Sequence, residues 1–401
     1  MDAAESRDRS PKPAESTPGL ARVITVSVAA TLLLRIAWAA IVPLEPISDS
    51  AAYFSFASTI ASGGGYGWEP NEPTAYWAVG PSAIYAAFFM VFGAGKFAVV
   101  LANLLFAVLG SACAVVLAER WFGRRAAWAA GVLFALWPTM IMFTTTLNSE
   151  QMFVSLLLAS LVITDPCREG SWKRAAFVGP VVAAMALVRP TGLLIPAVIA
   201  GTRVLRGRGR VRPIGQGLLA TAVMLACIAP WTVRNYRVFD EFVLISTNGG
   251  PNFWMGNNPE TTGHYMPLPE DVSALPETER ADILKSRALD YIRAEPVAFV
   301  SRSATKMLQQ HTTETIAVGW NEPALTDRFG DWVINPLKAA STGIWLATLA
   351  CPAVGFLTVI HRLGYLFAPT TPPNVPRGIC DTVQTVPTIP DRSPPHADTA
   401  T

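Results

Sequence analysis

The chain has 401 residues, of which 51% are hydrophobic and 15% are charged. Because soluble globular proteins carry about 25% charged residues, this composition excludes an ordinary soluble enzyme and favours an integral-membrane protein. Lys and Arg total 31 against 29 for Asp and Glu, so the net charge of +2 gives no indication of a nucleic-acid partner. The five cysteines lack the paired spacing of a disulfide framework or a zinc site.

Several apolar runs are long enough to cross a bilayer, which takes about 20 residues of helix. Residues 23–43 form the first run, interrupted only by Arg35. Further long uncharged runs follow at 97–118, 126–149, 213–233 and 339–360. Three shorter runs, 151–164, 175–188 and 190–202, are ambiguous when each is taken alone.

The basic segments orient these runs, because Lys and Arg collect on the cytoplasmic side of a membrane. They occupy residues 7–22, 120–125, 168–174 and 203–212. Two cytoplasmic loops require an even number of crossings between them, so the three shorter runs are predicted to be spans. The predicted fold class is therefore an all-α polytopic membrane protein with about eight transmembrane helices and two large extracytoplasmic loops.

This topology predicts five segments. They are a cytoplasmic disordered N-terminus (1–22), a transmembrane core (23–233) with an outer loop at 44–96, a second extracytoplasmic loop (234–332), a final transmembrane segment (333–368) and a disordered Pro-rich tail (369–401). No internal repeat is visible.

The two outer loops contain three predicted helices. In the first loop, Tyr53, Ala57 and Ile60 recur at helical spacing after Asp49, and the glycines at 63–65 end the pattern. Residues 76–92 are predicted to form an interfacial or re-entrant helix. Residues 277–294 of the second loop have the periodicity of an amphipathic helix.

Four charged residues are placed by this topology at the outer surface: Asp49, Glu150, Arg189 and Arg234. The first three have an ordinary structural explanation. Asp49 could cap a helix together with Ser48, and Glu150 could be stabilised by a helix dipole. Arg189 could snorkel, pair with an acid or bind an anion.

Two further features of the sequence have open interpretations. Residues 229–267 are dense in Asn, Gly, Pro and aromatic residues, which suits either a sugar-binding site or an ordinary turn-rich loop. His264 and His311 are isolated in the sequence, so their spacing does not favour a metal site.

Several motifs resemble a known family. They are SDSAAY (48–53), GGGY (63–66), the apolar segment 76–93, LNSEQMF (147–153), PWTVRNYRVFDEF (230–242) and STNGGPNFWMGNNPETTGHY (246–265). Together these motifs resemble membrane glycosyltransferases of the GT-C fold, a family that includes the protein O-mannosyltransferases and the bacterial aminoarabinose transferases. The resemblance implies that the donor is a hexose or pentose carried on a polyprenyl phosphate. It also implies that the protein lies in the cell membrane, in contact with the membrane lipids. Its acceptor would be a hydroxyl group of a protein, glycan or lipid at the extracytoplasmic face.

The resemblance also implies roles for individual residues. Asp49 matches the first-loop acid that serves as general base, and Glu150 matches an acid that orients donor or acceptor. Arg189 and Arg234 are candidates for the donor phosphate, because guanidinium groups bind phosphate oxygens bidentately. The candidate substrate-binding residues are Tyr53, Trp254, Asn257 and His264. Ser50 stands where many relatives have a second acid, so neither a metal nor another cofactor is predicted.

The predicted chemistry is a single displacement, which inverts the anomeric centre. Two alternatives stay open. Relatives usually continue into several more spans after the second outer loop. One alternative is therefore an inactive protein that only binds a lipid-linked sugar. A transporter or flippase is less favoured, because such proteins tend to carry inverted repeats and helices broken at the midplane.

Overall fold

The computed structural model describes residues 18–366 except 71, 166–168 and 208, and describes side chains as far as residue 350. Within these ranges the protein is all-α, as predicted, apart from an isolated bridge between Gly67 and Pro73. The tail predicted at 369–401 and residues 1–17 of the predicted N-terminal segment lie outside the described residues. Residues 18–22, which the sequence places in a disordered terminus, belong to the first helix.

Three helices are long and apolar enough to cross a membrane: α1 (Pro18–Ile41), α4 (Lys96–Phe122) and α10 (Val211–Phe239). A fourth candidate span combines α5 (Arg124–Leu136) with α6 (Pro138–Met142) and the short helix η1 (Phe143–Thr145), across a bend of 52°. The bend falls at Pro138, and the residue before a proline is disfavoured in helical conformation. The described residues thus form a helical membrane protein with three or four candidate spans.

The other predicted spans are helical but do not establish a count of eight. The helices α7 (Glu150–Thr164), α8 (Trp172–Val188) and α9 (Ile195–Leu205) are 15, 17 and 11 residues long, below the about 20 residues that a crossing needs. Helix α8 ends before Arg189, whose backbone is extended because a proline follows it. A 3₁₀ helix, η2 (Pro190–Leu194), then leads into α9. The last long helix is α17 (Ile334–Leu366).

The long helices pack through small residues. Helix α4 contacts α1, α5 and α7, and α8 lies between α7 and α10. A Cβ atom at Gly131 of α5 would lie 2.0 Å from Ser27 Oγ of α1. A Cβ atom at Gly179 of α8 would lie 2.5 Å from a methyl group of Val223 on α10. Close approach at small residues is typical of helix packing in membranes.

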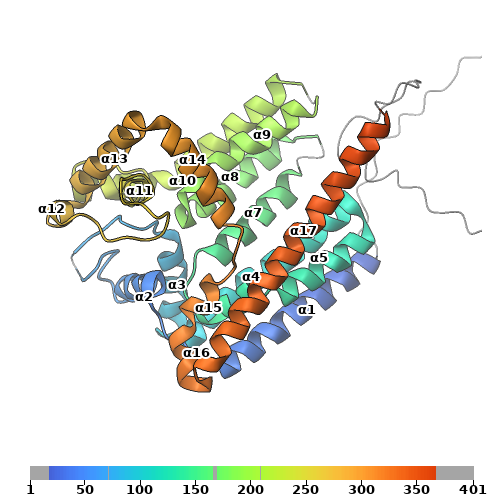
Figure 1. Ribbon diagram of the computed structural model, residues 1–401, viewed down its shortest axis with the longest axis horizontal. Coiled ribbons are helices and arrows are strands. Elements are labelled where there is room, and N and C mark those ends of the chain that lie inside the picture. Colours follow the sequence, from blue (N-terminus) through green and yellow to red (C-terminus); the bar gives the residue numbers. More distant parts are fainter. Residues whose placement is uncertain (1–17, 71, 166–168, 208, 367–401) are drawn as a thin grey trace, which may run out of the picture.

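The shorter helices gather at one end of the long ones (Figure 1). They are α2 (Ser48–Ala61), α3 (Gly80–Phe92), α11 (Gly249–Gly256), α12 (Glu270–Ser273), α13 (Glu277–Ala294), α14 (Pro296–Gln309), α15 (Ile316–Trp320), α16 (Glu322–Phe329) and η3 (Asp331–Val333). The helix predicted at 277–294 is confirmed with its bounds unchanged. The helix predicted at 76–92 begins only at Gly80, because the backbone of Ala75 and Tyr76 accepts hydrogen bonds from Thr247 and Asn248.

One carboxylate joins the two predicted outer loops. Glu277, the first residue of α13, accepts hydrogen bonds from Thr74 Oγ1 at 2.5 Å, from the backbone nitrogen of Ala75 at 2.9 Å and from Thr247 Oγ1 at 2.7 Å. Both loops are therefore held as one layer over the end of the long helices.

Candidate active site

Asp49 lies in the first turn of α2 but does not cap it. The capping position is Ile47, no side-chain hydrogen bond closes the helix start, and Ser48 has a φ of 51°. The capping role that the sequence allows is therefore not observed. Burial raises the pKa of the half-buried Asp49 carboxyl, and the nearby charge of Glu150 raises it further, whereas Arg189 opposes the shift.

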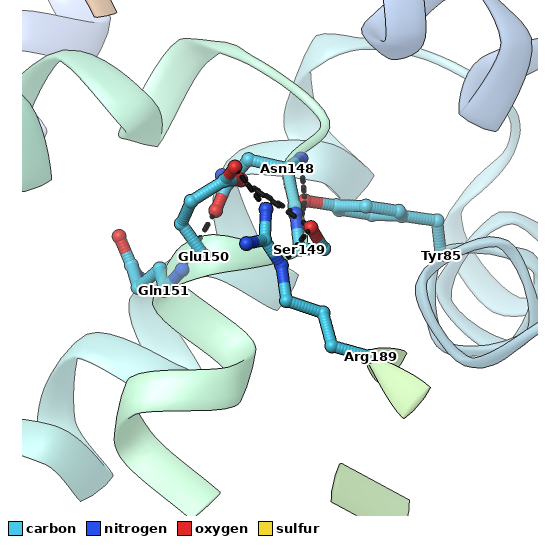
Figure 2. Close-up of polar contacts among 6 residues, drawn as sticks. All are labelled: Tyr85, Asn148, Ser149, Glu150, Gln151 and Arg189. Carbon is cyan, nitrogen blue, oxygen red and sulfur yellow. Dashed lines mark hydrogen bonds and ion pairs between the residues drawn. The ribbon is translucent and has the colours of Figure 1, made fainter. Parts of the chain in front are cut away.

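Glu150 and Arg189 form an ion pair. Arg189 Nη2 donates to Glu150 Oε1, and Arg189 Nε donates to Ser149 Oγ at 2.8 Å. Of the alternatives that the sequence allows for Arg189, pairing with an acid is the one observed. Figure 2 shows the two side chains meeting from α7 and from the turn after α8. The Arg189 side chain is 42% exposed, so a ligand can reach the guanidinium.

A buried network positions the segment before Glu150. Asn103 of α4 donates from Nδ2 to the backbone carbonyls of Phe143, Thr144 and Thr146 at 2.9–3.1 Å. Its Oδ1 accepts from the Tyr85 hydroxyl at 2.7 Å. That hydroxyl in turn accepts from the backbone nitrogen of Asn148 at 3.0 Å (Figure 2). Asn148 Oδ1 then accepts from Gln151 N at 3.0 Å, so a side chain satisfies one free N–H of the first turn of α7.

Ser50 and Tyr53 connect α2 to the same segment. The buried Ser50 accepts a hydrogen bond on Oγ from the backbone nitrogen of Leu147 at 3.0 Å. Burial and the charge of Asp49 raise the pKa of Tyr53, and a hydrogen bond with Ser149 opposes this. The structure therefore brings Asp49 and Tyr53 together with the Glu150–Arg189 pair.

The pair lines a cavity of about 720 Å³. Its polar lining residues are Thr139, Glu150, Arg189, Gln310, His311 and Glu314, and its apolar ones are Phe134, Trp137, Met140, Phe143, Val154, Ile316 and Trp345. The sequence indicates no site role for residues 310–314, because no motif links them to Glu150 or Arg189. The His311 ring stacks on Trp345 at 6.0 Å between centroids, and its Nδ1 lies 2.7 Å from the carbonyl of Met307.

Arg234 lies elsewhere and contacts protein atoms. Its Nη1 donates to the carbonyl of Thr74 at 2.7 Å, and its Nη2 donates to the carbonyl of Tyr66 at 2.8 Å. The guanidinium also lies 4.8 Å from the centre of the Trp231 ring. The structure thus gives Arg234 a role in fixing the first loop, and of the two arginines only Arg189 lines the cavity.

The three second-loop candidates lie in or after α11. Asn257 is buried and donates to the carbonyl of Phe253 at 2.9 Å. Trp254 accepts the backbone N–H of Asn257, and the exposed His264 donates its backbone N–H to Thr262 Oγ1. The lining of the cavity includes none of these residues, so their substrate-binding roles stay predictions.

The described residues contain no cluster of three or more His, Cys, Asp or Glu side chains arranged to hold a metal ion.

The described residues thus define a helical membrane protein with a carboxylate–guanidinium pair at the start of α7. Residues 78–233 match the model of the family described as dolichyl-phosphate-mannose-protein mannosyltransferase. The match confirms the predicted resemblance and supports a glycosyltransferase of the GT-C type. Searches of the curated proteins and of the solved structures give no significant match.

Proposed function

We propose that this protein transfers a sugar from a polyprenyl phosphate to a hydroxyl acceptor at the extracytoplasmic face of the cell membrane, with inversion. One observation carries the proposal. Asp49, whose pKa is raised, lies close to an ion pair between Glu150 and Arg189 that lines a largely apolar cavity. The family match adds a polyprenyl-type donor, because its description names a dolichyl-phosphate sugar.

The proposed step needs one base and one cation. Asp49 takes the proton of the acceptor hydroxyl as that oxygen bonds to the anomeric carbon, and a pKa nearer to neutral pH suits a general base. The bond from the anomeric carbon to the phosphate oxygen breaks with its electron pair, and polyprenyl phosphate leaves. Arg189 stabilises the charge that develops on the phosphate, and Glu150 holds Arg189 in place.

The arrangement of basic residues supports the proposed face. Arg120, near the end of α4, lies 3.8 Å from Asp165, which directly follows the C-terminus of α7. Glu150 stands at the other end of α7. Because Lys and Arg collect on the cytoplasmic side, the candidate active site belongs to the opposite side.

The test is a transfer assay with the full chain in proteoliposomes, using defined polyprenyl-phosphate sugars and hydroxyl-bearing peptide, glycan and lipid acceptors. We expect product of inverted anomeric configuration, and strongly reduced product from Arg189→Ala. The matched control is Arg293→Ala, because Arg293 is an exposed arginine paired with Asp290 on α13. Binding of donor without transfer would identify an inactive binding protein. Movement of the lipid-linked sugar across the bilayer without transfer would identify a flippase.

A further inference from the structure

Helix α14 exposes a continuous apolar face. None of its 14 residues is buried. Its apolar side chains recur at helical spacing, at Val297, Val300, Ala304, Met307 and Leu308, which places them on one side of the helix. Val297 is 82% exposed and Leu308 is 69% exposed.

Both cations of α14 point toward the protein, on the same side as the half-buried Ala298 and Phe299. Arg302 Nη1 donates to the Tyr291 hydroxyl at 3.0 Å, and the guanidinium lies 4.6 Å from the centre of that ring. Lys306 Nζ donates to the carbonyl of Gly256. A helix on a water-exposed surface has the opposite arrangement, with its apolar side toward the protein and its charges toward solvent. The orientation of α14 therefore suits an apolar surrounding medium.

The C-terminus of α14 lies near a pair of tryptophans. The helix ends two residues before His311, whose ring stacks on Trp345 of α17. Trp345 also packs against Trp137 at 6.1 Å between ring centroids. Tryptophan is enriched where membrane-spanning helices meet the membrane surface. In Figure 1, α14 runs across the direction of α17 rather than along it, as a helix lying in the plane of a membrane would.

We propose that α14 is an interfacial helix whose apolar face binds the lipid leaflet on the side of the candidate active site. The lipid surface is the occupant that these observations favour. The apolar face is exposed while both cations of the helix contact the protein, and the helix ends two residues before His311, which stacks on Trp345 of α17. Amphipathic helices of this kind insert their apolar side at the boundary between head groups and acyl chains. Bound in this way, α14 anchors the layer formed by α11, α13 and α14 to the bilayer and holds His311 at the rim of the cavity.

The experiment measures the depth of single fluorophores in lipid nanodiscs. The native cysteines at 113, 167, 227, 351 and 380 are replaced by serine or alanine, and one cysteine is introduced as Val300→Cys or Met307→Cys. The matched control is Ser286→Cys on α13, which is also exposed. We expect nitroxide groups on lipid acyl chains to quench the labels at 300 and 307 several-fold more than the label at 286. Aqueous iodide should show the reverse order.

Equal quenching of all three labels by iodide would overturn the proposal. If the labels at 300 and 307 are protected from iodide only in discs that hold two copies of the chain, the apolar face binds a second copy instead of lipid. A second measurement uses the unmodified protein, so that the proposal is tested even if the cysteine variants fail to fold. A photoactivatable lipid should attach to peptides spanning 296–309 and not to peptides spanning 277–294, and the opposite pattern would contradict an interfacial α14.

Discussion

Replacing Asn103 with alanine should destabilise the segment that positions Glu150. Asn103 is fully buried in α4, and its side chain bonds to three backbone carbonyls and to the Tyr85 hydroxyl. The exposed Asn252 on α11 is the matched control, because removing its amide leaves no buried group unpaired.

The expected loss of unfolding free energy follows from the groups that lose their hydrogen-bond partner. The carbonyls of Phe143 and Thr146 each keep a hydrogen bond from Asn148 Nδ2 at 3.1 Å. The carbonyl of Thr144 loses the donor described above, and the Tyr85 hydroxyl keeps only a 3.5 Å contact as a donor, to the carbonyl of Asn148. Because an unsatisfied buried polar group costs about 1–3 kcal/mol, Asn103→Ala should lower the free energy of unfolding by about 2–4 kcal/mol.

The assay is denaturant unfolding in mixed micelles, followed by tryptophan fluorescence, with Tyr85→Phe and the double variant measured in parallel. The two substitutions share a hydrogen bond, so their effects should be non-additive by about 0.5–3 kcal/mol. If Asn103→Ala unfolds at the same denaturant concentration as Asn252→Ala, the network does not stabilise this segment and the reasoning fails.

Three further predictions follow from the site and the first span. Because the charge of Glu150 raises the pKa of Asp49 and that of Arg189 lowers it, Glu150→Gln should move the acid limb of the rate–pH profile to lower pH. Arg189→Gln should move it to higher pH, and shifts of the opposite sign would refute the electrostatic assignment. Arg189→Ala should raise the donor KM roughly 10- to 100-fold, as expected for the loss of a charged hydrogen bond. Arg189→Lys should recover only part of the donor affinity, because lysine lacks the planar fork. An unchanged donor KM in both variants would show that Arg189 does not bind the donor. Arg35 is fully buried, its Nη1 donates to the carbonyl of Thr31 at 3.4 Å, and its Nε and Nη2 have no hydrogen-bond partner among the described residues. Because an unsatisfied buried polar group costs about 1–3 kcal/mol, Arg35→Met should raise the unfolding free energy by about that amount, and a lower melting temperature would contradict this.

The sequence predicts the helices well because apolar length and periodicity directly reflect membrane burial. The first-loop helix and the helix at 277–294 appear where they are expected, since their apolar residues recur at helical spacing. Charge placement also anticipates that Asp49, Glu150 and Arg189 lie at the same end of the long helices. The number of spans is harder to predict, because length alone does not decide whether helices of 15 and 17 residues cross the membrane.

The sequence could not predict the contacts that depend on side-chain partners far along the chain. Asn103 lies inside an apolar run, and nothing local indicates that it binds carbonyls 40 residues later. Glu277 resembles any acid at a helix start, yet it joins the two loops. Arg234 has the chemistry of a phosphate ligand, but the carbonyls of Tyr66 and Thr74 occupy its donors.

The most direct test of the central claim is the turnover of Asp49→Asn with saturating polyprenyl-phosphate sugar, measured together with thermal stability in detergent. Asp49 makes no capping hydrogen bond, so the asparagine variant should fold as the wild type does. Removing the proton acceptor should lower turnover about 100- to 10,000-fold. Wild-type turnover in a folded Asp49→Asn protein would contradict the assignment of Asp49 as the base.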